Sequence, residues 1–166
     1  MYTKKQVTVF KRVLAVDKRT DKQMIGKNGV YISSPFYGFR LGAGAEVDGL
    51  ESTDQTTFPA TVDRIMDTEH AADYPLPTRA EVKQFIAENG LKRNAVGRKA
   101  MDIGGGHFFN PFYLLDVYDV FGDVELFPFY QSTGMGWRAE YGWKSPLIIK
   151  TWGYESAYIM PVNPNK

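Results

Sequence analysis

Apolar residues recur with the period of an α-helix in two clear stretches of the chain. Over residues 4–18 they occupy one face while lysine and arginine occupy the other, and Thr3 and Gln6 stand at capping-box spacing before them. A second helix is predicted to begin after Thr78, whose Thr-x-x-Glu sequence is also a capping box, and to end at Gly90. Both stretches predict amphipathic helices with one buried face.

A third helix is predicted between Asn110 and Gly122. Asn110 suits the N-cap, Pro111 suits the first helical position, and Gly122 suits the end of the helix. Nearly all of its residues are apolar, so most of its surface is expected to be buried. The residues expected to form its buried stripe are Leu114, Val117, Tyr118 and Phe121.

Short apolar runs bounded by turn residues predict strands in the rest of the chain. An Asn-Gly pair at residues 28–29 separates two such runs, as in a β-hairpin. Residues 42–57, rich in Gly, Asp, Ser and Thr, predict a loop. Further strands are predicted over residues 36–41, 124–129, 137–143, 146–151 and 157–162. Helices and strands in this order predict an α+β fold.

Length and composition predict one compact domain over residues 1–166. The chain is 43% hydrophobic, enough for a single sizeable core. It has no run of about 18 apolar residues, and its first residues lack the features of a signal peptide, so we expect a cytoplasmic protein without a membrane partner. The absence of cysteine excludes disulfides, thiolate zinc sites and a cysteine nucleophile.

The formal net charge of +1 predicts no general attraction to nucleic acid, so any contact with DNA must be local. Basic residues do cluster in and just after the first predicted helix, and a second group lies at residues 92–99. Ordinary solvated surface is the simpler interpretation of both clusters, and contact with DNA phosphates is the alternative. The residues assigned to a DNA contact are Lys4, Lys5, Lys11, Arg12, Lys18 and Arg19.

Residues with catalytic or metal-binding chemistry are sparse. His70 and His107 are the only histidines, and no serine lies in a nucleophile-elbow pattern, so no catalytic triad is expected. His70 is placed in a polar loop, and His107, after the glycines at 104–106, in the approach from a strand to a helix. We predict no enzyme, no cofactor and no metal site. One alternative stays open, a carboxylate site formed by Asp63, Asp67, Glu69 and His70.

Four motifs in the last third of the chain occur in a recognisable order. They are FNPFYLLDV at residues 109–117, VEL at 124–126, SPLII at 145–149 and YIMPV at 158–162. Together they resemble the closing half-domain of bacterial sliding clamps, the β subunit of DNA polymerase III. That family ends in an FN-x-x-YLLD helix, a strand, an SP-x-x-I strand and a terminal Y-[LIV]-MP-[VM] strand. The resemblance is strongest over residues 101–162.

Two upstream motifs extend the resemblance. YGFRL at residues 37–41 is similar to the DGYRL strand of clamps, and FPATVDRI at residues 58–65 is similar to their FPD-x-x-R-[IV] segment. The family's domain uses a helix-plus-strands unit twice, which agrees with the helices predicted at the N-terminus and at Asn110. The resemblance therefore implies a clamp-like domain of antiparallel sheets with two packed helices, and an inserted helix at about residues 78–90.

The resemblance implies a binding protein with two surfaces. Clamps face duplex DNA with helices, and they bind short motifs of polymerases and other replication proteins in an apolar pocket. Met160 and Val162 suit such a pocket and are equally consistent with an ordinary strand core. The pocket residues implied here are Trp143, Lys144, Ser145, Pro146, Tyr158, Met160, Pro161 and Val162.

Two features depart from the clamp pattern. The helix after Asn110 carries Asp116 and Asp119 and no basic residue, which does not suit a surface that faces DNA. A clamp subunit joins three such domains and this chain has room for one, so a ring requires a head-to-tail homo-oligomer. Two functions stay open: a DNA replication accessory around duplex DNA, or a clamp-derived protein–protein interaction module of a phage or mobile element without DNA binding, which the acidic helix favours.

Overall fold

Three helices and ten strands are defined in the described part of the chain. The computed structural model describes residues 2–16, 24–26, 30–42, 44–50, 52–53, 70–73, 76–104, 106–122, 127–131, 146–151 and 155–162. The helices are α1 (Lys4–Val16), α3 (Arg79–Glu88) and α4 (Pro111–Phe121). The strands are β1 (Met24–Gly26), β2 (Val30–Ser33), β3 (Tyr37–Leu41), β4 (Ser52–Thr53), β5 (His70–Asp73), β6 (Met101–Asp102), β7 (Phe108–Phe109), β8 (Phe127–Gln131), β9 (Leu147–Lys150) and β10 (Ser156–Ile159).

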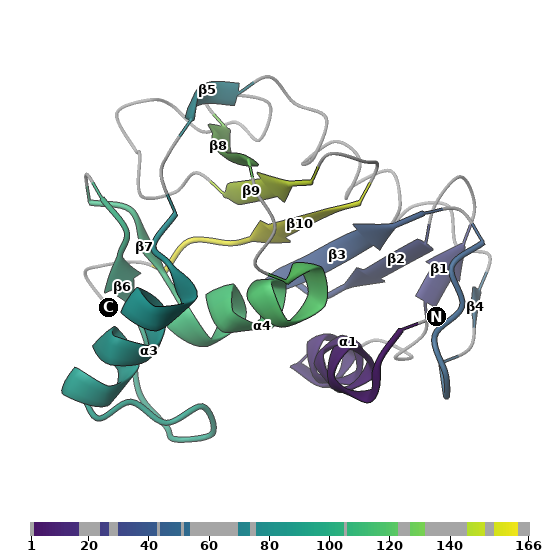
Figure 1. Cartoon of the computed structure of the whole chain (residues 1–166), viewed down its shortest axis with the longest axis horizontal. Helices are drawn as coiled ribbons and strands as arrows, with labels where there is room; N and C mark the ends of the chain where they lie inside the picture. The colour runs from purple at the N-terminus through teal and green to yellow at the C-terminus, as the bar shows by residue number, and fades with distance from the viewer. Residues whose placement is uncertain are drawn as a thin grey trace.

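Eight strands form one sheet in the order β4-β1-β2-β3-β10-β9-β8-β5 (Figure 1). Neighbouring strands run antiparallel except β1 and β4, which run parallel. The remaining two strands, β6 and β7, pair with each other in a separate hairpin. The predicted α+β class is confirmed.

The sheet is built from two units with the same order of elements. In the first, α1 is followed by the antiparallel meander β1-β2-β3, and in the second, α4 is followed by the antiparallel meander β8-β9-β10. The last strands of the two units, β3 and β10, pair antiparallel at the middle of the sheet. This order is the one expected of an approximate two-fold axis perpendicular to the sheet, between β3 and β10.

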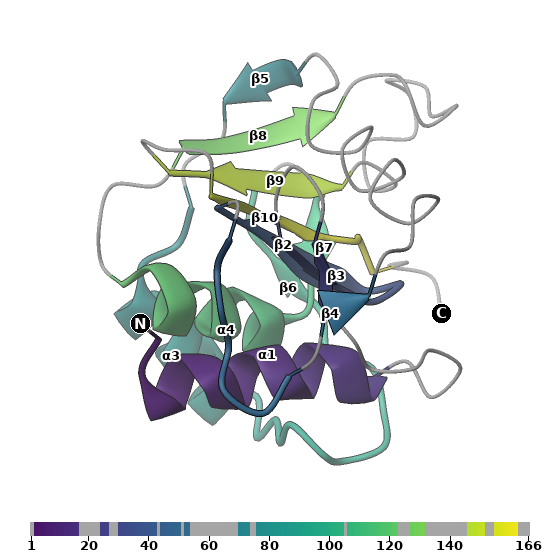
Figure 2. The same cartoon turned by 90° about the vertical axis from the view of Figure 1, so that its right-hand side faces the viewer.

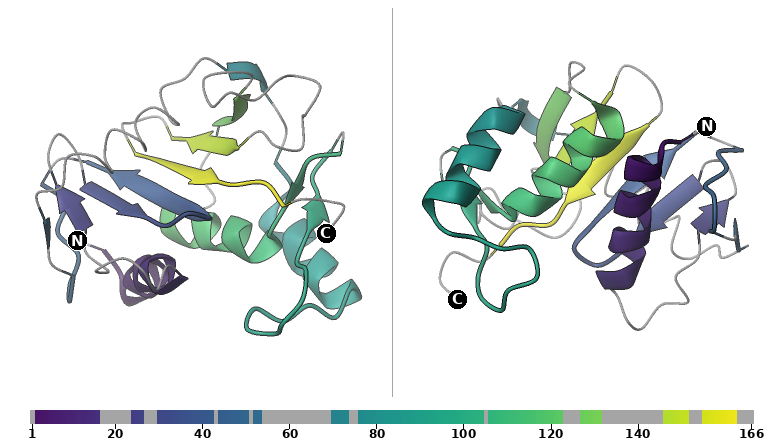
Figure 3. Two further views of the ribbon diagram at one scale, coloured as in Figure 1. Left: turned by 180° about the vertical axis from the view of Figure 1, so that it is seen from behind. Right: turned by 60° about the horizontal axis from the view of Figure 1, so that its bottom comes forward.

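α1 and α4 cover the same face of the sheet (Figures 1 and 2), and α3 lies beside α4, below the β6–β7 hairpin (Figure 1). In that layer α4 lies between α1 and α3 and contacts both (Figure 3). Because α4 is enclosed by the sheet and by both neighbouring helices, its apolar residues are buried on several sides, as its composition predicted. The outer surface of the layer therefore belongs mainly to α1 and α3 and to the segment that follows α3.

The hydrophobic core lies between the helix layer and the sheet. Alternate residues of β3, namely Tyr37, Phe39 and Leu41, belong to it and are fully buried. The ring of Phe39 meets the rings of Phe10 on α1 and Phe121 on α4 edge to face, at centroid distances of 5.6 and 5.7 Å. This cluster joins the helices of both units to the centre of the sheet.

Local capping signals set the helix starts as predicted. Before α1, the N–H of Thr3 donates to Oε1 of Gln6 at 2.8 Å, and the N–H of Gln6 donates to Oγ1 of Thr3 at 3.2 Å. Thr78 makes the same reciprocal pair before α3. The side chain of Asn110 accepts the N–H two residues along at 3.0 Å and so caps α4, which ends at Gly122 with a positive φ of 76°. Each cap satisfies a backbone group that the helix itself leaves unpaired.

Three predictions about the intervening segments are wrong. His70 does not lie in a loop, because β5 begins at that residue and pairs with β8 at the edge of the sheet. Residues 52–53, inside the predicted loop, form β4 beside β1. His107 lies inside the β6–β7 hairpin, after a turn in which Gly104 and Gly106 have positive φ, and not in a direct approach from a strand to a helix. β4 and β5 pair with strands that are distant in the sequence, and β6 and β7 have only two residues each, so their sequences carry little local signal.

Candidate functional site

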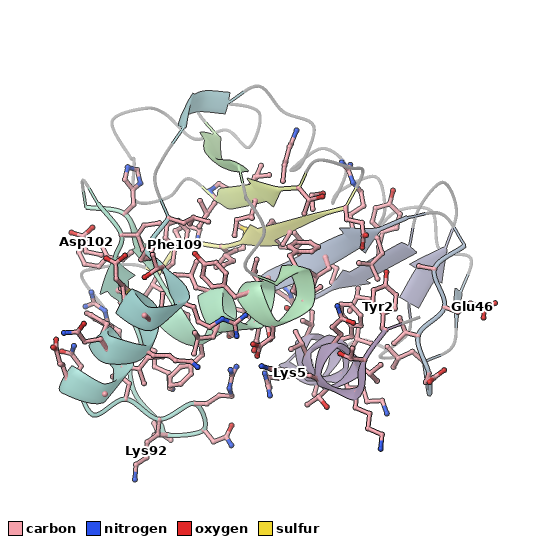
Figure 4. All side chains as sticks on the ribbon, viewed as in Figure 1. Tyr2, Lys5, Glu46, Lys92, Asp102 and Phe109 are labelled. Carbon is pink, nitrogen blue, oxygen red and sulfur yellow. The ribbon has the colours of Figure 1, made fainter. Side chains whose placement is uncertain are left out.

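The outer face of α1 is basic. Lys4, Lys5 and Lys11 are exposed along it, and 33% of the Arg12 side chain is exposed on the same helix. No aspartate or glutamate occurs in α1. Figure 4 shows Lys5 beside α1 and Lys92 at the outer edge of the helix layer, in the segment after α3. We call the outer surface of α1, α4, α3 and residues 89–104 the helix face.

A buried carboxylate holds the centre of the helix layer together. Asp116 of α4 is fully buried, and its Oδ2 accepts the hydroxyl of Tyr37 at 2.7 Å. Arg93 donates to both carboxylate oxygens at 3.0 Å, in a bidentate arrangement. Arg12 donates to Oδ1 at 2.5 Å. One carboxylate thus ties together α1, β3, α4 and the segment after α3.

The surroundings of Asp116 act on its ionisation in two directions. Burial has the largest effect and raises the pKa of Asp116 above its usual value, although the three donors bonded to the carboxylate lower it. The hydroxyl of Tyr37 is kept protonated, because burial and the adjacent carboxylate both raise its pKa far above the ordinary value. The ring of Tyr37 also stacks on Tyr113, with centroids 3.9 Å apart and an interplanar angle of 12°. The group is therefore bonded as a carboxylate among neutral and cationic donors.

The second acidic residue of α4 is paired as well. Asp119 accepts from Nη1 of Arg79 at 2.7 Å and lies 3.1 Å from Nζ of Lys5. Nη2 of Arg79 also donates to the carbonyl of Tyr118 at 2.8 Å. The expectation that this helix presents an acidic surface is wrong, since Asp116 is fully buried and Asp119 is paired with cations from both flanking helices.

The charge of the described helix layer differs from that of the whole chain. Residues 2–16, 76–104 and 106–122 contain ten lysines and arginines against five aspartates and glutamates. This part therefore carries a net charge of +5, whereas the chain carries +1. When Asp116, Asp119 and their four basic partners are set aside, six lysines and arginines remain against three acids, so the remaining charge of this layer is mainly positive.

The residues around the end of β10 are either buried or half-buried. Pro146 and Tyr158, both predicted to line a peptide pocket, lie in the interior. Met160, Pro161 and Val162 are half-buried. The backbone N–H of Met160 donates to the carbonyl of Phe36 at 2.8 Å, and the N–H of Val162 donates to that of Phe108 at the same distance.

Phe36 is an apolar residue of this region that the sequence analysis did not assign to a site. It lies in the turn before β3 with 49% of its surface exposed, next to Met160. The sequence predicts a strand over residues 36–41, but β3 begins one residue later, so Phe36 lies in the turn after Ser34 and Pro35. We call Phe36, Met160, Pro161 and Val162 the terminal-strand surface.

Tyr158 anchors β10 from the other side of the sheet. Its hydroxyl bonds to the hydroxyl of Ser33 and donates to the carbonyl of Ser34 at 2.6 Å. Gly38, its cross-strand neighbour, leaves room for the ring, because a Cβ there would lie 2.8 Å from a ring carbon of Tyr158. Burial raises the pKa of Tyr158 to about 12.

We expect the protein to lose stability at alkaline pH. Tyr158 and Tyr37 both have a raised pKa in the folded chain, so their stabilising contribution is complete below the pKa of tyrosine in the unfolded chain, about 10, and is lost as pH rises through the folded pKa. For Tyr158 alone the loss should reach about 1–1.5 kcal/mol by about pH 11. Urea unfolding at several pH values measures it, and Tyr158→Phe should show a smaller decline. An equal decline in both proteins would assign the effect to other groups.

Several residues assigned from the sequence lie outside the described part of the chain. Within that part, no group of three or more histidine, aspartate or glutamate side chains is placed to hold a metal ion. The structure therefore bears on the carboxylate alternative only through His70, which belongs to β5. The assigned residues outside the description are Lys18, Arg19, Asp63, Asp67, Glu69, Trp143, Lys144 and Ser145.

Of the helices in the described stretches, none is both long and apolar enough to cross a membrane. Searches against protein-family models, curated proteins and solved structures found no match to this chain.

Proposed function

We propose that this chain is a non-catalytic binding protein of the sliding-clamp type, an accessory of DNA replication. In this proposal the helix face contacts the phosphate backbone of duplex DNA, and the terminal-strand surface binds short motifs of replication proteins. The observation that carries it is the arrangement of two helix-plus-strands units in one sheet, with both unit helices on one face and only basic charge on α1.

The repeated unit supports the clamp interpretation independently of the sequence motifs. The motifs that resemble clamps lie mostly in the second unit, whereas the topology repeats the same order of elements in the first. α3 belongs to neither unit and packs against α4 at the side of the layer, as an inserted element would. A fold alone carries many functions, so the functional part of the proposal depends on the surfaces.

The pairing of the acidic residues of α4 removes the main objection to a DNA contact. Asp116 and Asp119 were the reason to doubt that this helix faces phosphates, and both are bonded to arginine. Lys4 and Lys11 are exposed on α1, and Lys5 keeps 64% of its side chain exposed although it pairs with Asp119. These lysines can neutralise phosphates and release the counterions bound to them. Such binding is independent of sequence and depends strongly on salt.

Removing single lysines from α1 should weaken binding to duplex DNA and its salt dependence together. For each of Lys4→Gln, Lys5→Gln and Lys11→Gln, the slope of log K against log salt concentration should decrease by about 1, because one phosphate contact is lost. Fluorescence anisotropy of a labelled duplex across a salt series measures the slope.

Lys150→Gln is the matched control for these variants. It removes the same charge from β9, where alternation with the core residues Leu147 and Ile149 places Lys150 on the face away from the helices. This variant should keep the slope of the unmodified chain. Equal effects of Lys150→Gln and Lys4→Gln would contradict contact through the helix face, and light-scattering mass on the same samples distinguishes a homo-oligomeric ring from a monomer.

A second candidate function is supported by the terminal-strand surface. In the described part of the chain, the exposed large hydrophobic residues are Phe36 and Val96. Phe36 adjoins the half-buried Met160. A flexible methionine beside an exposed aromatic ring suits an extended apolar peptide. A clamp-derived interaction module of a phage or mobile element would keep this surface and bind no DNA. Absence of salt-dependent DNA binding in the experiment above, together with a monomeric mass, favours this function.

A further inference from the structure

Two guanidinium groups meet on a single oxygen at the centre of the helix face. Nη1 of Arg12 lies 2.5 Å and Nη2 of Arg93 lies 3.0 Å from Oδ1 of Asp116. Since both bonds end on one atom, the two nitrogens are no further apart than the two lengths together, about 5.5 Å. Two like charges are therefore held close together, one from α1 and one from the segment after α3.

The carboxylate of Asp116 neutralises only part of the charge of the two arginines and accepts only some of their N–H groups. Asp116 supplies one negative charge to two positive ones, and the bonded hydroxyl of Tyr37 is neutral. Each guanidinium has five N–H donors, of which Arg12 uses one and Arg93 two toward the carboxylate. The cluster thus keeps a net positive charge and N–H groups that the carboxylate does not use.

The unused donors lie on the solvent side. Asp116 is fully buried, while 33% of the Arg12 side chain and 27% of the Arg93 side chain are exposed, so the guanidinium groups separate the carboxylate from solvent. The guanidinium carbon of Arg93 also lies 5.0 Å from the centre of the Phe112 ring, which fixes the position of the group. Both cations are therefore held in place before any ligand arrives.

We propose that Arg12 and Arg93 form a phosphate site, oriented by Asp116 and Phe112, that takes a backbone phosphate of nucleic acid. This inference rests on the proposed function and names the point of contact within the helix face. A phosphate has several oxygens and accepts paired N–H donors from planar guanidinium groups better than from a lysine. The negative charge of the phosphate would neutralise the positive charge that Asp116 leaves on the two arginines. The exposed lysines of α1 lie along the same face and can contact neighbouring phosphates.

The direct test follows the guanidinium N–H signals of the unmodified full chain by NMR. Inorganic phosphate and, separately, a short DNA duplex are added at constant ionic strength, and the signals are assigned with Arg12→Lys and Arg93→Lys. The Nε–H signals of Arg12 and Arg93 should shift with either addition. The signal of Arg40, whose side chain alternates to the other face of β3, should not shift.

A charge-preserving variant gives a second readout. Arg12→Lys keeps a cation beside Asp116 and loses the planar group, so duplex affinity should fall about fivefold to tenfold. Arg40→Lys is the control, because it makes the same change on the face of β3 that points away from the helices. Thermal melting of both variants verifies folding.

The outcomes separate this site from the proposed function. Shifts of both arginine signals with the duplex, whether or not inorganic phosphate also shifts them, support the site with nucleic acid as its source. If inorganic phosphate shifts both signals and the duplex does not bind by any measure, the phosphate site stands. Its assignment to DNA and the proposed function are then both overturned. Salt-dependent duplex binding that leaves both arginine signals and the Arg12→Lys affinity unchanged overturns the site and leaves the proposed function standing.

Discussion

Replacing Asp116 with alanine should lower the free energy of unfolding by about 2–4 kcal/mol. The change leaves the guanidinium groups of Arg93 and Arg12 without their carboxylate and removes the acceptor of the buried Tyr37 hydroxyl. Breaking one side of a fully buried ion pair costs about 3–5 kcal/mol, and the cost is lower here because both arginines keep partial contact with water. Urea unfolding followed by circular dichroism measures the loss.

Asp119→Ala is the control for this prediction. Asp119 lies on the same helix, and its pairs with Lys5 and Arg79 involve exposed or half-exposed cations, so the loss should be about 0–1 kcal/mol. In the double variant Asp116→Leu with Arg93→Met, stability should recover in part, since an apolar pair replaces the ionic one. Similar losses for Asp116→Ala and Asp119→Ala would show that the buried cluster contributes no more than a surface pair.

The helices were predictable from the sequence because their signals are local. Each capping residue acts on backbone groups two or three positions along, so Thr3, Thr78 and Asn110 identify their helices without any knowledge of the fold. Strands of the two meanders were also predicted, since their apolar runs are bounded by turn residues. β4 (Ser-Thr) and β5 (His-Ala-Ala-Asp) contain no large apolar residue, and β6 and β7 have two residues each, so none of the four forms an apolar run that predicts a strand.

The buried cluster was not predictable, although one part of its signal was present. Asp116 lies four residues after Phe112 and four before Val120, so it occupies the apolar side of its helix. That position indicates a buried carboxylate, yet its partners cannot be read from spacing. Arg93 and Arg12 are 23 and 104 residues away along the chain, and only the folded arrangement brings them together.

The same limit explains why the charge of α4 was misjudged. A carboxylate on a predicted helix is counted as surface charge unless its burial is known, and burial depends on which elements pack on either side. Here α1 and α3 flank α4 and each supplies a cation to Asp119. The net charge of α4 was therefore a poor guide to whether the helix layer can contact DNA. The burial and pairing of each charged side chain are a better guide.

Replacing Phe39 with alanine should lower the free energy of unfolding by about 3–5 kcal/mol. Phe39 is fully buried at the centre of the sheet, and its ring contacts Phe10 and Phe121 from the helices of both units. The loss combines the transfer of a large apolar side chain, the cavity left behind and two edge-to-face ring contacts. Because a domain has about 5–15 kcal/mol of stability in total, the variant should lose a large share of it. Urea unfolding at neutral pH measures the difference.

Phe36→Ala provides the matched control, since it makes the same substitution three residues earlier at a site that is 49% exposed. Its loss should be no more than about 1 kcal/mol, because much of that ring already contacts water. Phe39→Leu, which keeps most of the buried volume, should cost less than about 1.5 kcal/mol. If Phe39→Ala and Phe36→Ala destabilise the chain equally, the packing between the two units does not depend on the aromatic cluster. The order expected from the packing is Phe39→Ala, then Phe39→Leu, then Phe36→Ala, because the stability lost follows the buried contacts removed.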